Sequence, residues 1–156
     1  MDVYLLHKKQ GRWPNGSSEP IVRSILKKAR IKSTLSYVDG RPVFLEGKLF
    51  LSVSHSGSLM AIALAQQPIG IDLEENKTVK PEVIQRLTLY PASPLIDWCQ
   101  REAAIKLYNE PLYLMKPIPK ETVYQELHVS DEFTCILASK STLPLVRLIP
   151  LDEDDL

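Results

Sequence analysis

Three short strand-like segments in the middle of the chain constrain its fold more than any other feature. Residues 48–54 alternate between two faces of an extended chain, with Ser52 and Ser54 opposite the leucines and the valine. Residues 59–65 are almost wholly apolar and follow a Ser-Gly-Ser turn, and residues 69–74 follow a Gln-Gln-Pro turn. Apolar segments this short are typical of strands rather than helices. We therefore expect an antiparallel meander of three consecutive strands.

The rest of the chain predicts short helices and further strands. Proline makes up 12 of the 156 residues, which favours many short elements over a few long helices. The order of elements indicates an α+β fold of two similar small lobes, residues 1–75 and 76–156, in one compact unit. We expect three helices, at residues 20–30, 81–89 and 94–108, with Ser18 capping the first and Ser93 the third. The further expected strands are residues 3–7, 122–127, 133–138 and 145–149. Residues 152–155 are expected to form a disordered acidic tail.

Charge and composition exclude several classes of protein. The 19 lysines and arginines balance 19 aspartates and glutamates, whereas a protein that coats nucleic acid is usually basic. No segment approaches the ~18–20 consecutive apolar residues that a bilayer-spanning helix needs, and the first residues do not resemble a secretory signal. Cys99 and Cys135 form no CxxC pair. We expect a reduced, cytoplasmic protein with neither a nucleic acid nor a membrane as partner.

Two carboxylates mark the strand expected at residues 69–74. Asp72 and Glu74 project from the same side of that strand, because side chains alternate along it. Like charges this close are unfavourable unless a cation lies between them. Mg²⁺ is a suitable cation, since it is typically held by one or two carboxylates plus substrate phosphates. The same alternation is also typical of any half-exposed strand, so both interpretations stay open for this motif alone.

A third carboxylate lies on the helix expected at residues 94–108. Trp98, Glu102 and Lys106 are four residues apart and share one stripe of that helix. Glu102 is a candidate metal ligand or general base, and Lys106 a candidate for stabilising phosphate charge. An ordinary surface ion pair between the two would show the same spacing.

The segment Ser52–Gly57 carries the other polar candidates. A serine hydrolase is excluded because Ser54 and His55 are sequence neighbours that point to opposite faces, and because the chain has no GxSxG elbow. Donation to an anion at the end of the strand suits the serine hydroxyls and His55 better, with Gly57 allowing a tight turn. A histidine that merely packs at a hairpin is the alternative.

Taken together, in this order, these segments resemble the 4′-phosphopantetheinyl transferase superfamily, of the surfactin-synthetase-activating type. Such enzymes transfer the phosphopantetheine arm of coenzyme A to a serine of an acyl, peptidyl or aryl carrier protein. The resemblance covers residues 40–106 and rests on four motifs: Gly40-Arg41-Pro42, Leu51-Ser52-Val53-Ser54-His55-Ser56-Gly57, Ile69-Gly70-Ile71-Asp72-Leu73-Glu74, and Trp98 with Arg101-Glu102-Ala103 and Lys106.

The resemblance implies a two-lobed α+β fold with coenzyme A bound between the lobes. It also implies a role for each matching residue. Asp72, Glu74 and Glu102 would hold Mg²⁺ against the pyrophosphate, and Glu102 would also accept the proton of the carrier serine. Lys106 would stabilise charge on the pyrophosphate or leaving group. Ser54 and His55 would contact a coenzyme A phosphate, and Arg41 would lie near the nucleotide.

Three departures from the family pattern leave other functions open. Arg101 stands where lysine is usual, the Phe-Phe-x-x-x-Glu segment is reduced to residues 87–90 without a glutamate, and the chain is short. One alternative is a non-catalytic relative that binds coenzyme A or a carrier protein without transfer. The other is an unrelated structural or interaction module with ordinary surface carboxylates.

Overall fold

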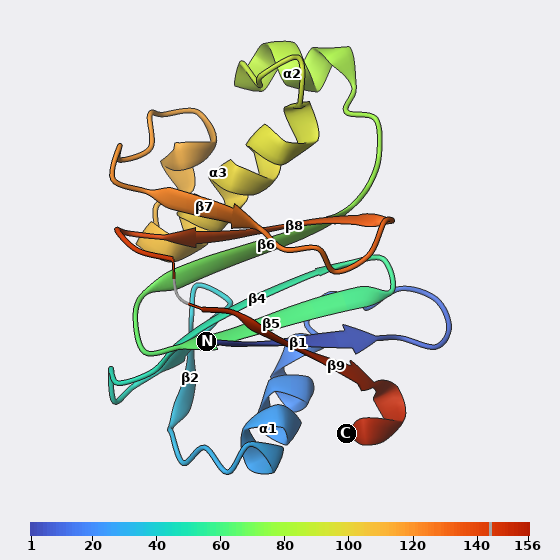
Figure 1. The fold of residues 1–156 in the computed structure, drawn as a ribbon, viewed down its shortest axis with the longest axis vertical. Coiled ribbons are helices and arrows are strands. Elements are labelled where there is room, and N and C mark those ends of the chain that lie inside the picture. The colour runs from blue at the N-terminus through green and yellow to red at the C-terminus, as the bar shows by residue number, and fades with distance from the viewer. Residues whose placement is uncertain (144) are drawn as a thin grey trace.

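Two β-sheets stack face to face, and helices cover their outer faces (Figure 1). The computed structural model describes residues 1–143 and 145–156. This α+β architecture confirms the fold class expected from the sequence. The first sheet has the strand order β4 (Phe50–Ser56), β5 (Leu59–Ala65), β1 (Asp2–His7) and β9 (Arg147–Asp152); helix α1 (Ser18–Lys28) covers it, and the hairpin of β2 (Leu35–Val38) and β3 (Arg41–Phe44) lies beside it.

The second sheet carries the remaining helices on its far side. Its central strand pairs antiparallel with both neighbours, and its apolar inner face packs on the first sheet. The strand order is β6 (Ile69–Glu75), β8 (Phe133–Ser139) and β7 (Val123–Glu126); the outer elements are α2 (Pro81–Leu87), α3 (Pro94–Tyr108) and the 3₁₀ turn η1 (Pro111–Leu114).

Strand β5 lies at the centre of the molecule, which explains its nearly unbroken apolar sequence. Ala61 and Ala63 face the second sheet and pack in one cluster with Leu73. Ile62, on the opposite face, packs in another cluster with Ile25 of α1. Burial on both faces removes the polar alternation of a half-exposed strand, and each large aliphatic side chain contributes ~1.5–3 kcal/mol by burial.

The predicted three-strand meander is wrong at its third strand. β4 and β5 do pair antiparallel, but β6 pairs with β8 in the other sheet. The reason is that both edges of β5 are occupied, one by β4 and the other by β1. The chain after β5 therefore has no free edge beside it and passes to the second sheet.

Two strand pairings connect the predicted halves of the chain. β6, from residues 1–75, pairs with β8, from residues 76–156. β9 returns to the first sheet and runs parallel to β1, so that sheet is not purely antiparallel (Figure 1). The acidic tail expected to be disordered forms the 3₁₀ turn η2 (Glu153–Asp155), because Glu153 accepts from the Lys9 backbone N–H at 3.0 Å and Asp154 pairs with the Lys9 ammonium.

The predicted serine caps are confirmed only in part, because Ser93 is the cap residue of α3 but Ser18 is not that of α1. The cap position of α1 is Ser17 rather than Ser18, and neither Ser17 nor Ser93 makes a side-chain cap bond. At α1 the third helical residue is Pro20, which has no N–H for a capping hydroxyl to accept. Within the described part of the chain, no helix has the length and apolar character needed to cross a membrane.

Candidate functional site

The two sheets meet at a seam where β4 lies beside β6 and serine side chains replace a backbone ladder. Each of three serines on β4 accepts a hydrogen bond from the backbone N–H of the β6 residue 19 positions further along the chain, so the strands run parallel. We call these residues the serine ladder: Ser52 Oγ accepts from Ile71 N at 3.0 Å, Ser54 Oγ from Leu73 N at 3.1 Å, and Ser56 Oγ from Glu75 N at 3.0 Å.

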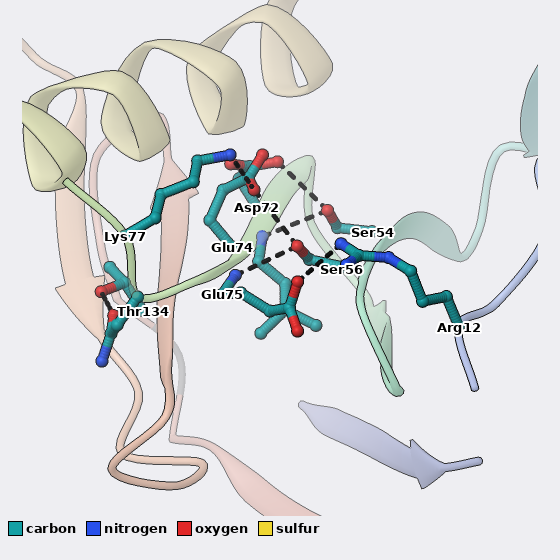
Figure 2. A network of polar contacts seen from close by, with 10 residues as sticks. Arg12, Ser54, Ser56, Asp72, Glu74, Glu75, Lys77 and Thr134 are labelled. Atoms are coloured by element: carbon teal, nitrogen blue, oxygen red, sulfur yellow. Dashed lines mark hydrogen bonds and ion pairs between the residues drawn. The ribbon is translucent and has the colours of Figure 1, made fainter. Parts of the chain in front are cut away.

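The serine ladder also holds the two carboxylates of β6 (Figure 2). The Ser54 hydroxyl donates to Asp72 Oδ1 at 3.1 Å, and the Ser56 hydroxyl donates to Glu74 Oε2 at 3.2 Å. A lysine reaches the same oxygen in each case: Lys106 Nζ lies 2.9 Å from Asp72 Oδ1, and Lys77 Nζ lies 3.2 Å from Glu74 Oε2. The predicted strand alternation is therefore correct for both acids.

Asp72 is the most tightly held acid of the site. Asp72 is only 4% exposed. Lys106 Nζ, which bonds it, also donates to the Ile71 carbonyl at 2.9 Å. The second carboxylate oxygen, Oδ2, is buried without a hydrogen-bond partner among the described residues. Leaving such an atom unpaired costs ~1–3 kcal/mol, more for a charged group. A buried carboxylate oxygen without a partner is suited to a cation.

Glu102, on α3, is the third predicted acid, and the charges of Asp72 and Glu74 act on it. Burial raises the pKa of the Glu102 carboxyl, and the negative charges of Asp72 and Glu74 raise it further. The positive charges of Lys106 and Arg41 oppose that rise. These interactions place the third predicted acid within electrostatic reach of the other two. Trp98, on the same helix stripe, packs in the apolar cluster around α2.

A cavity of about 220 Å³ lies beside Lys106. Lys106, which touches Asp72, lines this cavity together with Arg41 of β3. Arg41 Nη1 donates to the Ile105 carbonyl and to Asn109 Oδ1, both at 3.2 Å, so it also caps the C-terminal end of α3. The walls are mostly apolar: Val38, Pro42, Val43, Leu51 and Val53, with Ser52 and Asn109.

Ser54 and His55, the two predicted phosphate contacts, have different surroundings in the structure. The Ser54 hydroxyl is engaged with Asp72 and with the Leu73 N–H, so its proton is directed to a carboxylate. His55 is half-buried, and burial lowers the pKa of its imidazole, as does the charge of Lys106. A neutral His55 keeps one donor and one acceptor nitrogen.

Arg101 makes contacts that the sequence did not reveal. Its guanidinium makes five hydrogen bonds, two of them to the Asp97 carboxylate at 3.1 and 3.0 Å. The other three go to the carbonyls of Leu87, Thr88 and Leu114, at 2.6, 2.9 and 2.7 Å. Arg101 therefore ties α3 to the end of α2 and to η1. Lysine has only one donor atom and cannot make this set of bonds.

Both cysteines lie near the site, and the charge of Asp72 acts on each of them. Cys99 and Cys135 are free and buried. Burial raises the pKa of the Cys135 thiol to about 12 and raises that of Cys99 as well. Thiols with a strongly raised pKa stay protonated at neutral pH, so they are poor nucleophiles and metal ligands.

The fit of a metal ion depends on the carboxylates. In the described parts of the chain, no three His, Cys, Asp or Glu side chains are already arranged as ligands of one ion. Mg²⁺ does not need such a cage, because it is usually held by one or two carboxylates plus substrate phosphates and water. The unpaired Asp72 Oδ2, with the charges of Glu74 and Glu102 acting at the same place, fits a hard divalent cation.

Comparison with known proteins assigns no family to the chain. No family model matches the sequence, and a search of curated proteins gives no significant match. Function is therefore inferred from the site itself and from the sequence motifs that its residues form.

Proposed function

We propose that the protein is a Mg²⁺-dependent 4′-phosphopantetheinyl transferase that modifies a serine of a carrier protein with the phosphopantetheine arm of coenzyme A. The observation that carries the proposal is the Asp72 carboxylate. It is buried, one oxygen is bound by Lys106 and Ser54, and the other has no partner among the described residues. The charge of Asp72 acts on Glu102, and Lys106 lines a cavity together with Arg41.

Asp72, Glu74 and Glu102 would hold the cation, which when bound neutralises charge on the phosphate oxygens. Phosphoryl-type transfer depends mainly on such neutralisation and on positioning. Lys106 would add positive charge next to the pyrophosphate. The mostly apolar cavity with Arg41 would receive the nucleotide end of coenzyme A.

Glu102 would act as the general base. The carrier serine loses its hydroxyl proton to the Glu102 carboxylate while its oxygen bonds to the phosphorus of the phosphopantetheine, and adenosine 3′,5′-bisphosphate leaves. The raised pKa of Glu102 suits this role, because a base works best when its pKa is close to the operating pH.

The test is incubation with fluorescent coenzyme A, Mg²⁺ and a panel of acyl, peptidyl and aryl carrier proteins. We expect label on at least one carrier, and a fall of roughly 10²–10⁴-fold in the Glu102→Gln variant. A folded protein that binds coenzyme A yet labels no carrier would contradict the proposal.

A non-catalytic relative that binds coenzyme A or a carrier is the second candidate. It is favoured by one observation, that no three-ligand metal group is pre-arranged in the described residues. Calorimetry separates the two candidates: this one predicts coenzyme A binding whose strength does not depend on Mg²⁺, without transfer to any carrier.

A further inference from the structure

We propose that Ser54 and Ser56 are positioning residues that hold the carboxylates of Asp72 and Glu74 for a divalent cation. The inference rests on the proposed function, since it concerns the cation of the same site. It adds Ser56 to the site and gives Ser54 a role other than contact with a phosphate.

The two serines make the same pair of bonds two residues apart. Ser54 accepts from the N–H of Leu73 and donates to the carboxylate of the preceding residue, Asp72. Ser56 accepts from the N–H of Glu75 and donates to the carboxylate of the preceding residue, Glu74. A hydroxyl has one proton to donate, so acceptance from the backbone directs that proton to the acid.

The bonds leave one side of each acid free for a ligand. The serine and its neighbouring lysine share one oxygen, Oδ1 of Asp72 and Oε2 of Glu74. The second oxygen of Asp72 is buried and unpartnered within the described chain. Hydrogen bonds that fix a ligating carboxylate are part of a metal site, and their loss typically costs ~10–100-fold in metal affinity.

The serine ladder contains its own control. Ser52 accepts from Ile71 N at 3.0 Å, the same contact with β6 that Ser54 and Ser56 make. The residue before Ile71 is Gly70, which offers no carboxylate. Glycine is required there, because an added Cβ would lie 1.9 Å from the Ala103 carbonyl oxygen of α3. Ser52 thus has the structural contact without the acid.

The experiment compares Ser52→Ala, Ser54→Ala and Ser56→Ala by titrating each purified protein with Mn²⁺ and following free Mn²⁺ by electron paramagnetic resonance. Each variant leaves one β6 N–H without its acceptor, so all three should lower the thermal midpoint, and Ser52→Ala measures the effect of losing that contact alone. We expect Mn²⁺ affinity to fall roughly 10-fold in Ser54→Ala and Ser56→Ala and less than twofold in Ser52→Ala. Ser56→Thr, which keeps the hydroxyl, should restore it.

The outcomes separate this inference from the proposed function. Equal losses of affinity in all three variants, unchanged affinity in Ser54→Ala and Ser56→Ala, or no Mn²⁺ binding by the unmodified protein would each overturn the positioning role. A protein that binds Mn²⁺ with the expected pattern but labels no carrier protein would overturn the transferase and leave the positioning role standing.

Discussion

Lys106 is the residue whose removal should disturb the seam most. Its ammonium bonds the buried Asp72 carboxylate and the Ile71 carbonyl, both at 2.9 Å. Breaking a buried ion pair by removing one partner leaves an uncompensated charge and typically costs ~3–5 kcal/mol. We expect Lys106→Met to lower the free energy of unfolding by about that amount in urea titrations.

An exposed ion pair provides the matched control for Lys106. Arg23 and Glu19 lie one turn apart on α1 at 2.9 Å, with half-exposed side chains. Glu19→Gln should cost less than ~0.5 kcal/mol, because water screens such pairs. The double variant Asp72→Asn/Lys106→Met should lose less stability than the two single variants added together. Independent, additive losses would mean that the two groups are not coupled.

The charge of Glu102 should lower the stability of the fold. Because its pKa is raised in the folded protein, the native state binds a proton more tightly than the unfolded chain does. Its ionisation therefore destabilises the fold as pH rises from its ordinary value of 4.5 through the higher folded pKa. At neutral pH without divalent metal, Glu102→Gln should unfold at a higher temperature than the unmodified protein, although its transfer of label should be much slower.

The pH dependence checks the sign of that effect. The stability gain of Glu102→Gln should disappear below about pH 4.5, where the carboxyl is protonated in both states. Mn²⁺ should reduce or reverse the gain, since a cation stabilises the ionised carboxylate. A gain in stability that is independent of pH from 4 to 8 would show that the fold does not disfavour the ionised form of Glu102.

At the scale of elements, the contacts of Arg101 explain why arginine stands there. Its bonds to Asp97 and to the carbonyls of Leu87, Thr88 and Leu114 join three helical segments. Arg101→Lys keeps the charge but loses most of these bonds, so we expect a loss of roughly 2–4 kcal/mol in unfolding free energy. Arg86→Lys, at an exposed position of α2, should change stability by less than ~0.5 kcal/mol.

The elements were predictable where a local signal marks both ends. The apolar run Leu59–Ala65 and the helix Pro94–Tyr108 have the bounds that their turns and proline indicate. The sheet partner of β6 was not predictable, because strand pairing is decided by which edges other segments occupy. The strand 145–149 begins later than expected, at Arg147, and runs to Asp152 beside β1.

The candidate site shows the same division between local and non-local information. The side-chain alternation of Asp72 and Glu74 follows from the strand period alone. The link from Ser54 and Ser56 to these acids needs β4 and β6 side by side, which no turn or spacing specifies. One signal was present in the sequence: Ser52, Ser54 and Ser56 repeat with period two, as do the residues with which they pair.

At the scale of the whole molecule, small side chains of β5 lie between the two sheets. Ala61 and Ala63 of β5 are fully buried against the inner face of the second sheet. In the β4–β5 register, Ala61 is opposite Ser54 and Ala63 is opposite Ser52. The spacing of the sheets and the position of the serine ladder therefore depend on the same residues.

Enlarging one of these alanines should therefore alter the site as well as the core. Overpacking a core position typically costs ~1–3 kcal/mol, because its neighbours must shift. Ala61→Val should cost about that much and should also weaken Mn²⁺ affinity and carrier labelling, since the shift separates Ser54 from Asp72. Ile62→Val, on the face of β5 that packs on α1, should cost ~0.5–1.5 kcal/mol and leave Mn²⁺ affinity unchanged. If both variants weakened Mn²⁺ binding in proportion to their loss of stability, the site would depend on global stability rather than on the separation of the sheets.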